Sequence, residues 1–253
     1  MPAVKIKCQY LTDVTWNDTS GCDFGGIDFA DVWRVNISSN VSHLNRFANI
    51  INAEETARGK RYLHMHDRHR FIISRGALRT ILSRYSGLSP AEIEFGVGEN
   101  KKPFISNLKG SALLQYNVSH SGDWILIGVS NFAIGVDTEQ INPSFEFRDV
   151  VKDYFSDEEI SYINQDNGAE HFFKLWTRKE ALTKATAKGL DEDLKIIPSL
   201  DGEHLVEASV LKSIDSWLVS SFQLTQNYLG CVACNMALTQ IRFWDFAYYK
   251  TAN

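Results

Sequence analysis

Apolar side chains in the first half of the chain follow a helical repeat and then a strand-like alternation. Between about residues 54 and 85, apolar positions recur at steps of three and four, with Gly87 after the last: Phe71, Ile72, Leu78 and Leu82. This spacing predicts one long helix that ends at a glycine. A short helical turn is expected from SPAE at residues 89–92. Residues 113–139 alternate, which predicts two or three paired strands.

The second half repeats this order of helices followed by strands. Ser156 and Glu159 have the spacing of a capping box at the start of a helix. A second helix is expected from about residue 169 to residue 188, ending at Gly189. Three strand-like segments follow, HLVEASVL, WLVSSFQL and GCVACNMAL.

This order predicts an α+β fold with two similar lobes arranged as a pseudo-dimer. Each lobe is expected to pack helices on a small antiparallel sheet. We divide the chain into an N-terminal lobe of residues 1–130 and a C-terminal lobe of residues 131–253. The 253 residues are 44% hydrophobic, which is enough apolar material for one large core or two smaller ones.

Composition excludes several classes of protein. No apolar run approaches the about 20 residues that cross a bilayer, and the start MPAVKIKCQY lacks the layout of a secretory signal. We therefore expect a cytoplasmic protein with no membrane partner. Cys231 and Cys234 resemble half of a metal site, but no second pair accompanies them. On a strand they would face opposite sides, so we interpret them as structural thiols.

Positive charge is concentrated in one segment of an acidic chain. Between Arg58 and Arg84 there are eight basic residues and one acid, so this segment carries +7 while the remainder carries -12. An anion is expected to dock near the segment, although a solvated helix face would carry the same charges. The net charge of -5 argues against a nucleic-acid partner.

Three carboxylates are candidates for a magnesium site. Asp137 and Glu139 lie two apart on a predicted strand and therefore share a face. Glu180 lies four residues before Lys184 on the second helix of that half, which would place a carboxylate beside an ammonium. Magnesium takes one or two carboxylates together with substrate phosphates. The alternatives are solvent-facing strand ends and an ordinary surface ion pair.

A turn-flanked NVSHSGDW segment offers Ser119 and His120. Neighbours on a strand face opposite sides and no nucleophile-elbow glycines are present, so a Ser-His-Asp hydrolase is disfavoured. Both side chains suit phosphate binding, as does Lys102, which the following proline holds in an extended backbone. The histidines of MHDRH lack the four-residue spacing of a helical metal site and are interpreted as solvated or packing residues.

The motifs KKP, YNVSHS, IGVDTE and FFKLWTRKEALTKATAKGL occur in this order along the chain. Their order and approximate spacing resemble the 4′-phosphopantetheinyl transferases of the larger, surfactin-synthetase-activating class, over about residues 50–190. The resemblance implies a two-lobed monomer that moves 4′-phosphopantetheine from coenzyme A to a serine of an acyl, peptidyl or aryl carrier protein. Adenosine 3′,5′-bisphosphate is released, and magnesium is required.

The resemblance also implies roles for individual residues. The N-terminal lobe would grip the nucleotide, and the C-terminal lobe would hold magnesium and dock the carrier. The magnesium ligands would be Asp137, Glu139 and Glu180. The residues implied in binding coenzyme A are Arg58, Lys102, Ser119, His120, Lys179 and Lys184. Of these, Lys184 would contact a phosphate. Lys184 and Glu180 are also implied to be catalytic residues.

Glu55 departs from the family pattern, and Glu159 has two possible roles. Glu55 stands where a well-known member of the class carries a lysine, so Arg75 or Arg79 is expected to take over that contact. Glu159 occupies a position proposed to accept the serine proton, and its rival role is the capping box. Carrier proteins of this kind are generally acidic and are expected to approach a basic or apolar rim.

Two other functions fit parts of the sequence. A non-catalytic module could bind nucleic acid or an acidic partner through the Arg58–Arg84 segment, and its binding would then weaken with salt. A metal-dependent phosphohydrolase would cleave nucleotides or coenzyme A without any carrier serine.

Overall fold

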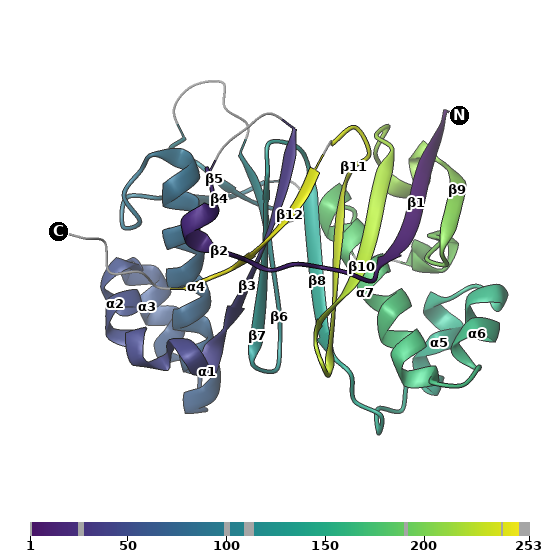
Figure 1. The fold of residues 1–253 in the computed structure, drawn as a ribbon, viewed down its shortest axis with the longest axis horizontal. Coiled ribbons are helices and arrows are strands. Elements are labelled where there is room, and N and C mark those ends of the chain that lie inside the picture. The colour runs from purple at the N-terminus through teal and green to yellow at the C-terminus, as the bar shows by residue number, and fades with distance from the viewer. Residues whose placement is uncertain are drawn as a thin grey trace.

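Two five-stranded sheets, each covered by helices, form the framework of the molecule (Figure 1). The computed structural model describes residues 2–24, 28–98, 102–108, 114–189, 192–238 and 240–247. One sheet has the strand order β8 (Ile134–Gln140), β11 (Tyr228–Asn235), β10 (Trp217–Thr225), β1 (Ala3–Leu11), β9 (Gly202–Glu207). The other has the order β2 (Asn17–Asp18), β12 (Gln240–Asp245), β3 (Phe29–Asn36), β7 (Trp124–Ser130), β6 (Gln115–Ser121). A small ribbon pairs β4 (Phe95–Val97) with β5 (Pro103–Ile105).

The helices are divided between the two halves, as the predicted α+β class requires (Figure 1). Those of the first half are α1 (Ile37–Asn40), α2 (Leu44–Ile50), α3 (Ala53–Lys60) and α4 (Met65–Ser86). Those of the second half are α5 (Arg148–Tyr154), α6 (Asp157–Ile163), α7 (Gly168–Thr186) and α8 (Ala208–Leu211). Within the described ranges, every helix is too short or too polar to cross a membrane.

Local sequence signals placed α6 and α7 correctly, misplaced two features in the first half and extended the predicted strand HLVEASVL into α8. The predicted second-half helix is α7, and the Ser156 capping box opens α6 with both reciprocal hydrogen bonds. The single helix expected over residues 54–85 is wrong, because the chain breaks between α3 and α4 and leaves Leu63 97% exposed. The predicted helical turn at residues 89–92 is a hydrogen-bonded turn outside any helix.

The two chain ends cross between the sheets. The first strand, β1, pairs in parallel with β10 of the second half, while the last strand, β12, pairs in parallel with β3 of the first half. Figure 1 shows the connection from β1 running across the molecule to β2. The expected antiparallel pairing therefore holds except where these ends join. The predicted boundary after residue 130 lies at the end of β7, before the turn to β8. The division of the chain into two lobes at this point stays a prediction.

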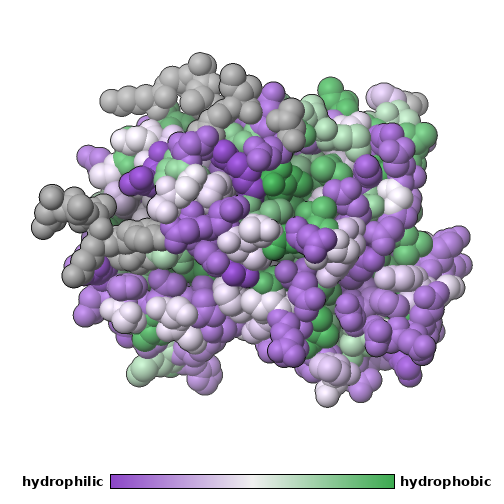
Figure 2. Space-filling model, in the orientation of Figure 1, coloured by the Kyte–Doolittle hydropathy of each residue, from purple (hydrophilic) through white to green (hydrophobic). Residues whose placement is uncertain are grey.

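Apolar side chains join the sheets face to face. One core cluster draws from both sheets and includes Val32, Leu126, Val136, Phe222 and Val232. All four cysteines are free and buried. Cys231 and Cys234 belong to different core clusters, as expected for strand residues three apart. In the view of Figure 2, apolar residues gather over the central strands and polar residues over α5 and α6.

Close packing between α7 and β8 depends on Gly135. A Cβ at this position would collide with the carbonyl oxygen of Ala181 and the backbone nitrogen of Ala185, both on α7. Main-chain atoms cannot move aside as a flexible side chain can. Absence of a side chain at residue 135 therefore lets α7 lie directly against β8.

We expect Gly135→Ala to lower the free energy of unfolding by about 1–3 kcal/mol, because overpacking displaces α7 from the sheet. Gly21→Ala is the matched control, since its added methyl would lie 3.8 Å from Trp244, at ordinary contact distance. Urea denaturation followed by circular dichroism measures both. Equal unfolding free energies for the two variants would contradict this account of the packing.

Candidate functional site

A pocket of about 330 Å³ lies where β6 and β8 meet α7. Its lining residues are Val118, Ser119, His120, Asp137, Glu139, Trp176, Glu180 and Lys184. We call it the acidic pocket. The three predicted metal ligands thus come together with three of the predicted phosphate contacts, although these six residues lie between positions 119 and 184 of the chain.

Period-two alternation on two facing strands aligns the carboxylates of β8. The Ser119 hydroxyl donates to Asp137 at 2.7 Å, and the Ser121 hydroxyl donates to Glu139 at 2.9 Å. Asp137 and Glu139 therefore share one face of β8, as predicted. Ser121 was missed by the sequence reasoning, although its two-residue spacing from Ser119 could have identified it.

The remaining charged groups of the pocket come from α7. Lys184 Nζ donates to Asp137 at 2.6 Å and lies 3.9 Å from Glu180 Oε2. Glu180 and Lys184 are one helical turn apart, which confirms the predicted carboxylate–ammonium pair. Because α7 lies close to β8, this pair faces the carboxylates of the strand.

Burial raises the pKa values of all three carboxyl groups, and charge repulsion adds to the shift at Glu139 and Glu180. Burial raises the pKa of Asp137 even though Lys184 and Ser119 oppose it. Burial, followed by the charge of Asp137, raises the pKa of Glu139 to about 6. The same two causes, in the same order, raise the pKa of Glu180 to about 7. A cation bound among them would favour the charged forms.

The donor set fits a hard divalent cation. Asp137 Oδ2 is buried and has no hydrogen-bond partner among the described residues, so one carboxylate oxygen is available. Within the described ranges, no group of three or more acidic, histidine or cysteine side chains is arranged to hold a metal ion on its own. Magnesium does not require such a group, because it keeps water and uses substrate phosphates as ligands. The pocket would need such a ligand to complete the site.

A histidine and an arginine lie near the carboxylates. The ring of His120 lines the pocket, and its pKa is lowered by partial burial and by the charges of Arg70 and Lys184. Arg70, on α4, also donates to Asp67 at 2.8 Å. The sequence analysis included Arg70 in the basic segment but did not predict a separate role for it.

Lys102 lies next to the end of α7. Its ammonium donates to the carbonyl oxygen of Ala185 at 2.8 Å, and burial lowers its pKa. This contact joins the first half of the chain to the helix that carries Glu180 and Lys184. Lys102 does not line the acidic pocket itself.

The other predicted arginines lie outside the pocket lining. Arg75 and Arg79 both pair with Glu55, whose carboxylate also completes the capping box of α3. Arg79 is fully buried and donates to two further carbonyl oxygens, so its described contacts are structural. Arg58 is exposed, with its guanidinium 5.5 Å from the ring centre of Phe71.

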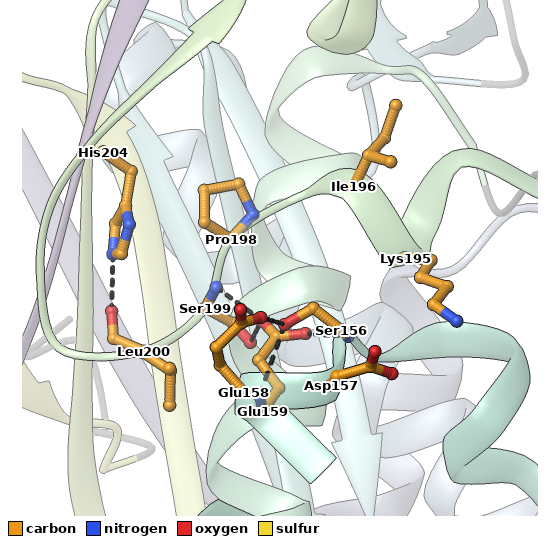
Figure 3. A pocket seen from close by; sticks show the side chains of 10 residues that line it. All are labelled: Ser156, Asp157, Glu158, Glu159, Lys195, Ile196, Pro198, Ser199, Leu200 and His204. Atoms are coloured by element: carbon orange, nitrogen blue, oxygen red, sulfur yellow. Dashed lines mark hydrogen bonds between the residues drawn. The ribbon is translucent and has the colours of Figure 1, made fainter. Parts of the chain in front are cut away.

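Glu159 and Lys179 form a buried ion pair of 2.9 Å, and neither lines the acidic pocket. Glu159 instead lines a separate pocket of about 640 Å³ beside α6 (Figure 3). Its carboxylate accepts from the Ser156 backbone at 2.9 Å, which confirms the capping role.

Comparisons with known proteins give one consistent result. The family model described as "4′-phosphopantetheinyl transferase superfamily" matches residues 133–233, and the model described as "4′-phosphopantetheinyl transferase, N-terminal" matches residues 35–131. The first match includes β8 and α7, and the second includes β6.

Three relatives illustrate the likeness. The chain is 28% identical to the 4′-phosphopantetheinyl transferase HetI of Nostoc sp., over 87% of this chain and 93% of that protein. It is 32% identical to a Synechocystis sp. protein described as a putative 4′-phosphopantetheinyl transferase, over 76% of this chain and 82% of that protein. It is also 32% identical to the 4′-phosphopantetheinyl transferase Sfp of Bacillus subtilis, over 57% of this chain and 64% of Sfp.

The raised pKa of Glu180 predicts a pH-dependent cost to stability without metal. Its pKa is about 7 when folded, against 4.5 for an ordinary glutamate, so the folded protein binds more protons between these values. The free energy of unfolding should therefore fall as pH rises, by on the order of 2 kcal/mol between pH 5 and 8. Glu180→Gln should reduce this loss, and the raised pKa values of Asp137 and Glu139 account for the part that remains. We would compare urea denaturation at both pH values in a chelator.

Glu203→Gln is the control, because Lys5 lowers the pKa of this exposed glutamate. That substitution should give no stabilisation at pH 8. If the free energy of unfolding depends on pH equally in the parent protein and in Glu180→Gln, ionisation of Glu180 does not destabilise the fold.

Proposed function

This chain belongs to the superfamily of enzymes that transfer the 4′-phosphopantetheinyl group from coenzyme A to carrier proteins, and we propose that the acidic pocket carries out that transfer. The observation that carries the proposal is the meeting of Asp137, Glu139 and Glu180 with Lys184 and His120 in one pocket. A diphosphate with a bound cation needs both signs of charge within a short distance.

We assign the cation to the three carboxylates. Asp137 and Glu139 would hold magnesium from β8, and Glu180 would hold it from α7. When bound, the cation would neutralise the pyrophosphate and the departing bisphosphate. The raised pKa values support this assignment, because these carboxylates lie in a site that disfavours their charge unless a cation is near.

Basic and hydroxyl side chains would orient coenzyme A. Lys184 would exchange part of its contact with Asp137 for a phosphoryl oxygen, and His120 with Ser119 would bind the 3′-phosphate. Arg70 lies close enough to His120 to add charge there. Arg58 and Lys102 remain candidates for the outer part of the nucleotide. Arg75 and Arg79 would support this region through Glu55, since both are held by its carboxylate.

The chemical step is a displacement at phosphorus. The serine oxygen of the carrier forms a bond to the phosphorus that bears the pantetheine arm, while the bond to the bridging oxygen breaks and adenosine 3′,5′-bisphosphate leaves. The serine proton passes to a carboxylate oxygen, which we assign to Glu180 because this residue faces the pocket. Positioning by the surrounding contacts supplies much of the rate.

A single chain suffices for this site. Strand β6 comes from the first half, whereas β8 and α7 come from the second, so one molecule supplies every lining residue. This arrangement supports a monomer as the working unit. Carrier proteins of the acyl, peptidyl and aryl types are all candidate partners.

Transfer is tested by incubating the protein with coenzyme A, magnesium and a panel of apo carriers. Intact-mass spectrometry should show the phosphopantetheine adduct on at least one carrier. Asp137→Ala should abolish transfer while the fold is retained, because the pyrophosphate charge is left uncompensated. Glu203→Ala, at an exposed carboxylate, is the control. Coenzyme A cleavage with every carrier left unmodified would instead indicate a phosphohydrolase.

His120→Ala should weaken the binding of coenzyme A by about 10-fold and leave 3′-dephospho-coenzyme A nearly unaffected, since one charge-assisted contact to the 3′-phosphate is lost. Isothermal titration calorimetry measures both ligands. His66→Ala, at an exposed ring on α4, is the control. Equal weakening of the two ligands would place His120 against another part of the nucleotide.

A further inference from the structure

Both carboxylate oxygens of Glu159 are already occupied by donors. One oxygen accepts from the backbone and hydroxyl of Ser199, at 2.8 Å and 2.5 Å. The other accepts from the Ser156 backbone and lies 2.9 Å from Lys179 Nζ. Figure 3 shows Glu159 directed at Ser199 and Ser156. A carboxylate has about four lone-pair positions, so little acceptor capacity remains for a substrate proton.

Lys179 is equally committed. Its ammonium contacts Glu159 and donates to the carbonyl oxygens of Leu194 and Ile197, at 2.9 Å and 2.5 Å. These three acceptors match its three N–H donors. The side chain is 1% exposed. Glu159 therefore supplies the counter-charge that lets an ammonium remain buried on α7.

The preceding residue of α7 is held by the same segment. Arg178 donates to the Ser199 carbonyl at 2.7 Å, to Asp201 at 2.6 Å and to the Ser221 hydroxyl of β10 at 2.8 Å. Ser199 thus contacts both Glu159 and Arg178. Two consecutive residues of α7 are fixed to the chain between residues 194 and 201.

Successive residues of a helix point about 100° apart, so the direction of one fixes the direction of the next. Arg178 and Lys179 point toward the segment just described, and the adjacent Glu180 points into the acidic pocket with Lys184 one turn later. Rotation of α7 about its axis would move Glu180 and Lys184 away from Asp137. The contacts of Lys179 oppose that rotation.

We propose that Glu159, Lys179 and Ser199 form a clamp that sets the rotation of α7 and thereby positions Glu180 and Lys184 for metal and phosphate. Glu159 is then a positioning residue that takes no proton from the carrier serine. This inference rests on the proposed function, because it concerns the same metal ligands. It assigns a purpose to a buried ion pair that the transfer mechanism itself does not use.

Glu159→Gln tests the clamp, since glutamine keeps the helix cap but removes the counter-charge of Lys179. We expect the magnesium concentration for half-maximal transfer to rise about 10-fold, as for other residues that orient a metal ligand. The rate at saturating magnesium should be nearly unchanged, because Glu159 takes no part in the proton transfer. Mn²⁺ binding, measured by electron paramagnetic resonance with coenzyme A present, should weaken by the same factor. Glu158→Gln, at the exposed neighbouring glutamate, should leave both measurements unchanged.

The double variant Glu159→Gln/Lys179→Met should recover most of the lost Mn²⁺ affinity, because it removes the buried ammonium together with its partner. Should Glu159→Gln fail to fold, Ser199→Ala provides a milder change that removes only the hydroxyl contact, with a smaller loss in the same direction.

Two results would overturn the clamp. A loss of about 10²–10⁴-fold in rate at saturating magnesium, with unchanged Mn²⁺ affinity, would make Glu159 the proton acceptor. Behaviour identical to Glu158→Gln would reduce it to a helix cap. Failure of the proposed function would be seen in the parent protein. If the parent protein neither binds Mn²⁺ nor modifies any carrier, the proposed function itself is contradicted, whatever the variants do.

Discussion

Three carboxylates held in one small pocket impose the main constraint on this protein. Burial raises the pKa values of Asp137, Glu139 and Glu180, and the charge of Asp137 adds to the shift at both glutamates, so keeping the three together costs folding free energy. Lys184, Ser119 and Ser121 offset part of this cost by donating hydrogen bonds. The surrounding structure provides the rest.

Much of that structure keeps α7 and β8 from separating. Gly135 allows the helix to approach the strand, and Lys102 holds the last turn of the helix from the other half of the chain. The exchange of end strands between the sheets joins the halves on which the pocket depends. The same helix therefore carries the site on one side and buried structural cations on another.

Those buried cations show that tertiary contacts give neighbouring residues of one motif different roles, some structural and some at the site. In WTRKEALTK, Arg178 and Lys179 are buried among carbonyl oxygens and carboxylates, whereas Glu180 and Lys184 face the acidic pocket. The motif alone marks Lys179, Glu180 and Lys184 as candidates for chemistry. Burial decides which can reach a ligand, because a fully satisfied buried ion has no group left to offer.

The sequence by itself determined the fold class, helix α7, the α6 capping box and the shared face of Asp137 and Glu139, because these follow from periodicities and caps within short segments. Its motifs also indicated the family. Only the tertiary structure decided that the chain ends exchange sheets, that Arg79 is buried on Glu55 and that Glu159 pairs with Lys179. These contacts join positions about 20 to more than 200 residues apart, and no local pattern specifies which distant partner a charge will meet.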